Sequence, residues 1–376
     1  MTTAELRPLA GGPAWLVIQL LERCNLRCNM CYEWGESGAY KSLPGLAELD
    51  LDLLLERLDE CLTGKPRVEF FGGEPLLYRG IWKLLRVLGD AGCEVAFPTN
   101  GTTLARHAHR LVSPNPTRVW VSLDGPREIN DAQRGAGVYD RATRGIDAID
   151  RLKHETGHPY PELGVIFVVT PANHHTIEEF FLELDLSRLG AVSIEMQSYV
   201  TAEQHRHYAR VAHEKFGVTT TPSAAAYVRD PAVFANVDPD AVACQMRHVR
   251  DECRQRGIRF FSQPRTLERE TIAAYLSADW PGMADHHQRC AVPWMYAEIS
   301  ARGDVTTCHS FYDITVGNIY DRSLIDIWHG ERAAEVRSHL RRELFSICTA
   351  CTRYYASSAH PIAPTTARRR NDSWPM

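Results

Sequence analysis

Short apolar segments alternate with longer segments of helical periodicity between residue 14 and about residue 200. The segment after Asp50, a suitable helix N-cap, carries leucines at 51, 54, 55, 58 and 62, the spacing of one helix face. Strands are expected at 15–20, 68–71, 94–97, 118–123, 164–170 and 192–196, and helices at 51–62, 80–91, 103–111, 140–154 and 176–186. Apolar strands alternating with helices indicate a parallel sheet covered by helices. The pattern predicts an α/β fold with a partial (β/α)6 TIM-like barrel over residues 13–200.

The rest of the chain has a different pattern. Residues 201–285 are rich in His, Arg and Ala and predict connecting helices at about 202–214, 238–256 and 267–277. Residues 286–355 form a candidate small domain with four cysteines. The polar residues 356–376 are expected to be a disordered tail.

Composition narrows the function classes. With 44% hydrophobic and 24% charged residues the chain is an ordinary globular protein, and its net charge of −5 does not favour a nucleic-acid partner. No signal peptide and no apolar run long enough to span a membrane is found in the sequence. Eleven cysteines in such a chain favour metal or thiol chemistry in a reducing compartment. We therefore expect a cytoplasmic protein with neither a nucleic-acid nor a membrane partner.

Candidate functional residues follow the expected strands. In barrels of this type, active-site residues gather at the carboxyl ends of the strands. In order along the chain, these positions hold the loop of Cys24, Cys28 and Cys31, the segment Gly72–Pro75, Asn100, the pair Ser122 and Asp124, the pair Thr170 and Asn173, and the pair Glu195 and Gln197. Six successive strand ends thus predict one polar edge where chemistry takes place.

Cys24, Cys28 and Cys31 directly follow the first expected strand. A [4Fe–4S] cube has four iron corners that thiolates usually hold. Three cysteines would leave one iron open, and an open metal position is where chemistry can happen. A structural zinc site needs a fourth ligand, and no further Cys or His occurs before Cys61.

The CxxxCxxC spacing resembles the signature of the radical S-adenosylmethionine (SAM) superfamily. The resemblance implies that the open iron chelates SAM, and that an electron from a flavodoxin-type or ferredoxin-type reductant splits SAM to a 5′-deoxyadenosyl radical. Gly72, Gly73, Glu74 and Pro75 match a family motif verbatim, which implies that they bind the SAM amino group. Taken alone, the same four residues also fit a tight turn.

The resemblance implies further cofactor-binding residues. Ser122 and Asp124 resemble positions that contact the ribose or methionine part of SAM, and Arg134 resembles an arginine near its carboxylate. Asn100 at its strand end joins this set, and Met30 and Tyr32 flank the cluster loop near the expected adenine position. Strand-end capping, a surface arginine and core packing are the alternative interpretations of these residues.

Cys290, Cys308, Cys348 and Cys351 form a second set. Residues 288–353 resemble the SPASM/twitch extension of radical SAM enzymes, with a hairpin of residues 298–300 and 305–307. A full SPASM domain has seven cysteines, but no cysteine follows Cys351 here. The resemblance therefore implies one auxiliary [4Fe–4S] cluster with all four irons held by protein, and a four-cysteine zinc site is the alternative.

The other cysteines differ in pattern. Cys61, Cys93 and Cys253 share apolar stripes and are expected in the core. Cys244 lies off its stripe and is either an exposed thiol, a packed thiol or a hydrogen-atom donor in catalysis. Glu195 is a candidate catalytic residue that could take a proton.

The substrate is the least determined feature. Since the barrel begins by residue 15, we see no room for an N-terminal peptide-recognition domain, and many peptide modifiers have two auxiliary clusters. Both features favour hydrogen abstraction from a small molecule, such as a sugar, aminocyclitol or natural-product intermediate, followed by oxidation (dehydrogenation). The alternatives are a radical SAM epimerase and a peptide-modifying enzyme, either a maturase of ribosomally made peptides or one resembling sulfatase maturases. A scaffold without turnover is disfavoured by the intact Cys24, Cys28, Cys31 and Glu74.

Overall fold

The computed structural model describes residues 6–309 and 312–357, so most of the expected tail lies outside the described residues. Ten strands form one sheet in the order β10-β9-β8-β1-β2-β3-β4-β5-β6-β7. All pairs from β8 to β7 are parallel. The parallel strands of the N-terminal region are β1 (Trp15–Leu21), β2 (Arg67–Gly72), β3 (Val95–Thr99), β4 (Thr117–Ser122), β5 (Glu162–Val169), β6 (Ala191–Met196) and β7 (Arg259–Gln263). The predicted strands and the partial barrel are confirmed.

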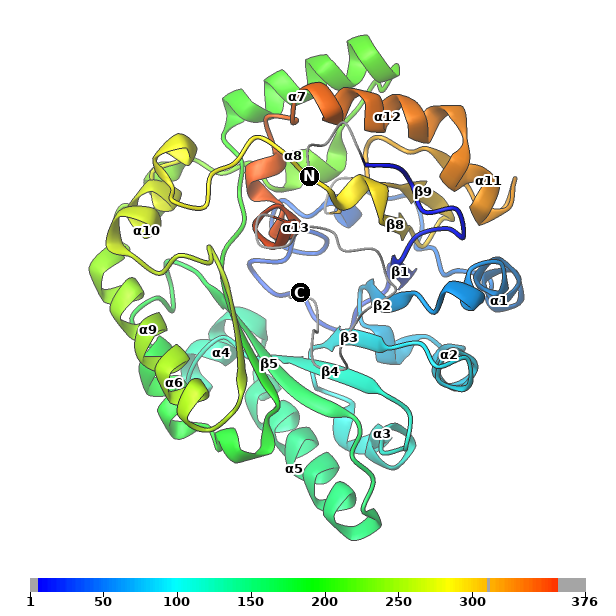
Figure 1. Cartoon of the computed structure of the whole chain (residues 1–376). Helices are drawn as coiled ribbons and strands as arrows, with labels where there is room; N and C mark the ends of the chain where they lie inside the picture. Colours follow the sequence, from blue (N-terminus) through cyan, green and yellow to red (C-terminus); the bar gives the residue numbers. More distant parts are fainter. Residues whose placement is uncertain (1–5, 310–311, 358–376) are drawn as a thin grey trace.

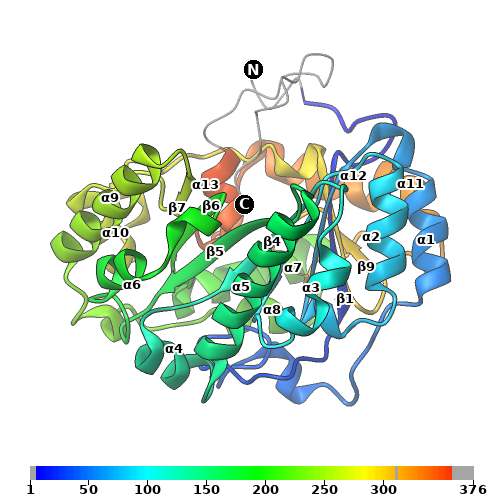
Figure 2. The same ribbon diagram turned by 90° about the horizontal axis from the view of Figure 1, so that it is seen from below.

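Helices cover the outside of the curved sheet (Figure 1, Figure 2). Those of the barrel are α1 (Leu51–Asp59), α2 (Ile81–Asp90), α3 (Leu104–Leu111), α4 (Arg127–Arg134), α5 (Val138–Thr156) and α6 (Ile177–Glu183). Helix α1 begins as predicted, since the Asp50 carboxylate accepts a 2.9 Å hydrogen bond from the Leu53 amide. Leu54, Leu84, Leu104 and Ile149 are fully buried on the inward faces of these helices. Helix α4 was not predicted, because it is mostly polar and short.

The connecting segment contains α7 (Ala202–Phe216), α9 (Pro239–Gln255) and α10 (Arg269–Leu276), which agree with the three expected helices, and the short α8 (Pro222–Ala226), which was not predicted. Strand β7 is an addition to the expected architecture. It pairs with β6, so that Glu195 and Gln263 occupy neighbouring positions of the ladder. Its five residues carry no alternating pattern, and its pairing joins segments far apart in the chain.

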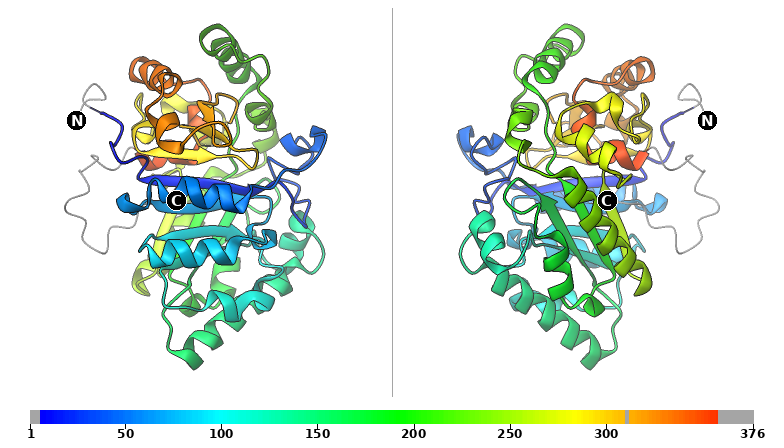
Figure 3. Two further views of the ribbon diagram at one scale, coloured as in Figure 1. Left: turned by 90° about the vertical axis from the view of Figure 1, so that its right-hand side faces the viewer. Right: turned by 90° about the vertical axis from the view of Figure 1, so that its left-hand side faces the viewer.

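The C-terminal region continues the barrel sheet (Figure 3). The predicted hairpin is present as β8 (Tyr296–Ile299) and β9 (Asp304–Thr306), and β8 pairs in parallel with β1. Gly303 in the turn has φ +84°, a conformation that glycine adopts readily, and an added Cβ would lie 2.4 Å from the Tyr320 ring. The remaining elements are β10 (Gly317–Asn318), α11 (Leu324–His329), α12 (Glu331–Arg342) and α13 (Thr352–Ser357). Among all described helices, none is both long enough and apolar enough to cross a membrane.

Candidate active site

The loop after β1 brings Cys24, Cys28 and Cys31 to one cavity of about 250 Å³ at the carboxyl ends of the strands. We call it the SAM cavity. The Cys31 amide donates to the Cys28 carbonyl (3.2 Å), which folds the loop back on itself. Amides also point at two of the sulfurs: Leu26 N lies 3.4 Å from Cys24 Sγ and Trp34 N lies 3.2 Å from Cys31 Sγ. Such N–H groups stabilise a thiolate ligand, so the loop suits a metal cluster.

Burial disfavours the charged thiolate form of the cysteines in this loop. Burial raises the pKa of Cys24 to about 11 and that of Cys31 to about 12, although the Leu26 and Trp34 amides oppose the shift. Within the described residues, no three Cys, His, Asp or Glu side chains converge closely enough to hold a single metal ion. Three separated thiols on one cavity wall fit an iron–sulfur cube, whose ligands attach at different corners.

The segment Gly72–Pro75 lies against the cysteine loop. The Gly73 amide donates to the Leu21 carbonyl (2.8 Å) and the Glu74 amide to the Arg23 carbonyl (3.1 Å). An added Cβ on Gly72 or Gly73 would lie about 2.3 Å or 2.2 Å from those same carbonyl oxygens. The two glycines thus permit close approach to the protein's own backbone, besides lining the SAM cavity as predicted.

Glu74 is almost completely buried at the cavity wall. One carboxylate oxygen accepts hydrogen bonds from Thr99 Oγ1 (2.7 Å) and the Leu76 amide (3.2 Å), and the other accepts one from the Asn100 amide (2.8 Å). Burial raises the pKa of Glu74, and these donors oppose the shift. The side chain is therefore held rigidly in one orientation, as recognition of an ammonium group requires.

Asp124 and Arg134 form a buried pair. Arg134 Nε donates a 2.5 Å hydrogen bond to Asp124, whose other oxygen accepts from the Val168 amide (2.8 Å). Arg134 lines the SAM cavity, whereas Asp124 lies behind it. Burial raises the pKa of Cys28 and the charge of Arg134 opposes the shift, so the guanidinium lies close to the cluster loop. Asp124 thus acts through Arg134, which it orients.

The other predicted cofactor-binding residues also gather here. Met30, Tyr32, Pro75, Asn100 and Ser122 all line the SAM cavity. Tyr32 stacks on Tyr227, with ring centroids 3.8 Å apart, and its hydroxyl donates to the Ser198 carbonyl (2.6 Å).

Sequence reasoning missed Tyr227 and Glu33 as cavity residues. Tyr227 follows α8 in the connecting segment and reaches the site only through tertiary packing. Glu33 could have been predicted from the sequence, because it lies only two residues after Cys31.

A second cavity of about 240 Å³ lies deeper in the barrel, and we call it the inner cavity. It shares six lining residues with the SAM cavity: Tyr32, Phe71, Pro98, Ser122, Val168 and Tyr227. Glu195 lines it, as expected for the end of β6, and accepts a 2.9 Å hydrogen bond from Ser193 Oγ. Burial raises the pKa of Glu195, which the Ser193 hydroxyl opposes.

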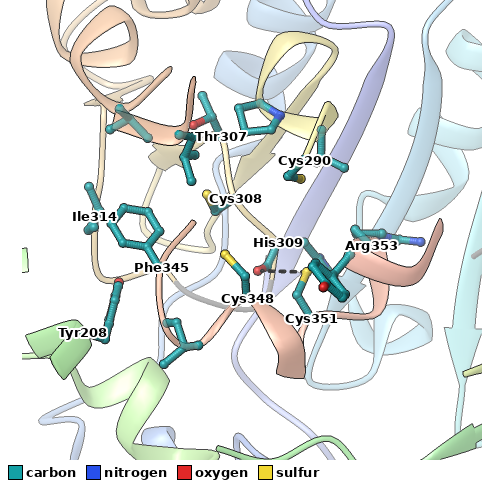
Figure 4. Close-up of a pocket in the computed structure, with 16 residues that line it drawn as sticks. Tyr208, Cys290, Thr307, Cys308, His309, Ile314, Phe345, Cys348, Cys351 and Arg353 are labelled. Carbon is teal, nitrogen blue, oxygen red and sulfur yellow. Dashed lines mark hydrogen bonds between the residues drawn. The ribbon is translucent and has the colours of Figure 1, made fainter. Parts of the chain in front are cut away.

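Cys290, Cys308, Cys348 and Cys351 surround one largely apolar space (Figure 4). Their sulfurs turn toward it from the loop before β8, the end of β9 and the turn before α13. Burial raises the pKa of Cys308, Cys348 and Cys351, and the neighbouring thiols raise the pKa of Cys308 and that of Cys348 further. Four separated thiols fit a cluster with every iron held by protein, and a mononuclear zinc site would need them to converge on one point.

The residues beside the auxiliary cysteines reach the inner cavity. His309 and Arg353 line both the inner cavity and the auxiliary space. His309 Nδ1 lies 3.0 Å from Glu298 Oε2 and 2.9 Å from the Tyr296 hydroxyl. The inner cavity therefore lies between the two sets of cysteines.

The structure does not bring Cys244 to these cavities. It lies on α9, where its Sγ is 3.8 Å from His248 Nε2. Cys244 is not among the described residues that line the SAM cavity or the inner cavity. Cys61, Cys93 and Cys253 are buried in the core, as expected.

Two family models match this chain. The radical SAM superfamily model matches residues 18–184, and the model of the SPASM iron–sulfur cluster-binding domain matches residues 290–352. Together they cover more than half of the chain. The chain belongs to the radical SAM superfamily and carries a SPASM domain. Enzymes of this superfamily bind a [4Fe–4S] cluster together with SAM. The SPASM domain indicates auxiliary iron–sulfur clusters in addition.

Individual relatives resemble most of the chain. The serine-type anaerobic sulfatase-maturating enzyme of Bacteroides thetaiotaomicron is 25% identical over 89% of this chain and 78% of its own length. A tungsten-containing aldehyde ferredoxin oxidoreductase cofactor-modifying protein of Pyrococcus furiosus is 21% identical over 90% of this chain and 87% of its own length. The crystal structure of Streptococcus suis SuiB bound to S-adenosylmethionine has the same fold, with a TM-score of 0.60 and 18% identity over 92% of this chain and 72% of its own.

Proposed function

We propose that this chain oxidises one side chain of a peptide or protein substrate, with the reacting carbon held in the inner cavity. The observation that carries this proposal is the position of the inner cavity between the two cysteine sets. When bound, the cluster and SAM supply a 5′-deoxyadenosyl radical that removes a hydrogen atom from carbon, and the auxiliary cluster supplies a one-electron acceptor. Two hydrogens leave the substrate in total, one as an atom and one as a proton.

Glu195 is the residue placed to take the proton. It lines the inner cavity, and within the described part of the chain its side chain accepts one hydrogen bond, from the Ser193 hydroxyl, which leaves carboxylate acceptor capacity for a substrate. Because burial raises its pKa, Glu195 holds a proton more readily than an exposed carboxylate does. These properties suit a general base whose proton is kept after transfer.

A peptide substrate is supported by size and by similarity. The inner cavity, at about 240 Å³, is smaller than the roughly 300–1,000 Å³ of pockets that enclose a whole drug-sized ligand. It suits one side chain that enters while the rest of the chain stays outside. The similarity to a sulfatase-maturating enzyme over 89% of this chain supports the same class, and so reverses the preference for a small molecule.

Oxidation of a small polar molecule is the second candidate, and the polar side chains of Glu195, His309 and Arg353 in the cavity wall favour it. The test uses the anaerobically reconstituted holoenzyme with SAM, a reductant, and either short peptides containing Ser or Cys or a panel of aminocyclitols and sugars. We expect 5′-deoxyadenosine to form with the peptides and the peptide product to be about two hydrogens lighter than the substrate. When the reaction is run in deuterated water, this product should carry no deuterium at the reacting carbon.

Stimulation by small molecules alone would replace the first candidate with the second. A product of unchanged mass in ordinary water, with one deuterium gained in deuterated water, would instead identify an epimerase.

A further inference from the structure

A third cavity, of about 250 Å³, follows the edge of β7, and we call it the β7 cavity. Four consecutive strand residues, Phe260–Gln263, line it, and Thr352 and Tyr355 of α13 line it as well. Figure 2 shows α13 beside this end of the sheet. The β7 cavity shares Glu195 and Thr352 with the inner cavity, so the two adjoin.

Strand β7 has a free edge. It pairs with β6 on one side, and in the described part of the chain no strand pairs with it on the other. The Arg259 amide donates to the Gly190 carbonyl (3.1 Å) next to β6. Since alternate residues of a parallel strand bond to the same neighbour, Phe260 and Ser262 direct their N–H and C=O groups to the free edge. Side chains of successive strand residues point to opposite faces of the sheet. A cavity that contacts all four residues from Phe260 to Gln263 therefore cannot lie on one face alone and runs along the free edge.

Gln263 provides a second observation that points to a ligand. Its side chain is 3% exposed and lines the β7 cavity. Gln263 Nε2 donates to Ser198 Oγ (3.4 Å), but Oε1 has no hydrogen-bond partner among the described residues. A buried acceptor without a partner is uncommon in native proteins, and an N–H group of a ligand would satisfy it.

The charges in the β7 cavity select the ligand. Arg250 and Arg265 both line it, and Glu195 is the carboxylate in the same wall. Arg250 Nε donates to the exposed Asp251 (2.9 Å), and Asp285 accepts the Arg265 amide (3.0 Å), which fixes that loop. Two arginines in the wall of one cavity favour a carboxylate on the ligand.

We propose that the free edge of β7 binds the substrate peptide as an added strand, with an acidic residue on Arg250 and Arg265. The strand directs the reacting side chain past Glu195 into the inner cavity. Main-chain hydrogen bonds to Phe260 and Ser262 supply affinity, and the two arginines supply specificity. This inference rests on the proposed function, because it names the substrate as an extended acidic peptide.

The first test changes the ligand and leaves the protein intact. The probe is a fluorescein-labelled acetyl-Glu-Val-Ser-Val-Glu amide, and its anisotropy is measured with the holoenzyme in the absence of SAM. We expect binding at least about tenfold tighter than that of the matched Lys-Val-Ser-Val-Lys probe. N-methylation of single peptide nitrogens should weaken binding at every second position, because only alternate N–H groups face β7.

The second test changes the strand. Ser262→Pro removes the N–H that faces the free edge, at an edge position where proline is tolerated, and Ser262→Ala is the control that keeps this N–H. We expect about tenfold weaker probe binding for Ser262→Pro alone, with iron content and SAM cleavage without substrate unchanged. The double variant Arg250→Glu, Arg265→Glu should prefer the lysine probe.

Any of three binding results would overturn the docking site: no wild-type binding up to about 1 mM, N-methylation tolerated at every position, or equal binding by the Pro and Ala variants. Binding without oxidation of any peptide would instead contradict the proposed function and leave the docking site standing. Oxidation of peptides by Ser262→Pro at the wild-type KM would contradict the docking site alone.

Discussion

Arg353, two residues beyond the last auxiliary cysteine, donates a 2.6 Å hydrogen bond to Glu69 on β2, 284 positions away in the chain. Both side chains are buried, and Arg67 lies 2.7 Å from the other Glu69 oxygen. Burial alone would raise the pKa of Glu69, but Arg353 and Arg67 hold it below its usual range. The Arg353 guanidinium also lies 4.1 Å from the Trp15 ring centroid. The buried ion pair of Arg353 and Glu69 thus connects the auxiliary region to the barrel beside the inner cavity.

Replacing Arg353 should therefore destabilise the fold. Arg353→Ala leaves the Glu69 charge buried with Arg67 as its remaining partner, and removing one member of a buried pair typically costs about 3–5 kcal/mol. Anaerobic urea unfolding of the holoenzyme measures the loss. Lys83→Ala is the control, because its ion pair with Asp52 is exposed and is worth at most about 1 kcal/mol. Equal midpoints for the two variants would show that the buried pair contributes little.

Iron content should report the two cysteine sets separately. The reconstituted enzyme should hold about eight irons, and the triple change of Cys24, Cys28 and Cys31 to Ala should leave about four, because the auxiliary thiols surround a separate space. Cys61→Ala is the control, since this thiol is buried in the core and should leave iron unchanged. Four irons in the wild type together with one zinc would replace the auxiliary cluster with a zinc site.

Glu74→Gln should weaken SAM binding without loss of iron. The carboxylate of Glu74 accepts three hydrogen bonds from donors, and a glutamine would turn its NH₂ group toward one of them and carry no charge for an ammonium. We expect the SAM Kd of the holoenzyme to rise about tenfold or more, measured by equilibrium dialysis. Glu48→Gln on the exposed surface is the matched control. An unchanged Kd would remove Glu74 from the SAM site.

Much of the site could be predicted from the sequence because its parts follow strand ends. The cysteine loop, Glu74 and Asn100 each end a parallel strand, and parallel strands present their carboxyl ends at one edge. For such residues, local pattern and topology together determine position.

Contacts between distant segments could not be predicted in this way. Tyr227 stacks on Tyr32 from the connecting segment, and β7 becomes a strand only because β6 is there to pair with it. The arginine that pairs with Glu69 comes from α13, and no periodicity relates the two. Burial is likewise a property of the folded chain, so the raised pKa of Glu195 has no counterpart in the sequence.

The pH dependence of turnover tests Glu195 directly. As a base it works only when ionised, and burial raises its pKa, so product formation should rise with pH through a value above that of a free glutamate. Glu195→Gln should lower product formation about 10²- to 10⁴-fold and abolish this rise, while SAM cleavage without substrate stays near wild type.

Ser193→Ala sharpens the test, because the Ser193 hydroxyl donates to the ionised carboxylate and so lowers the Glu195 pKa. Loss of that hydrogen bond should move the rise in product formation to higher pH, since the ionised form loses a stabilising donor. Retention of the same rise in Glu195→Gln would show that another group in the inner cavity takes the proton.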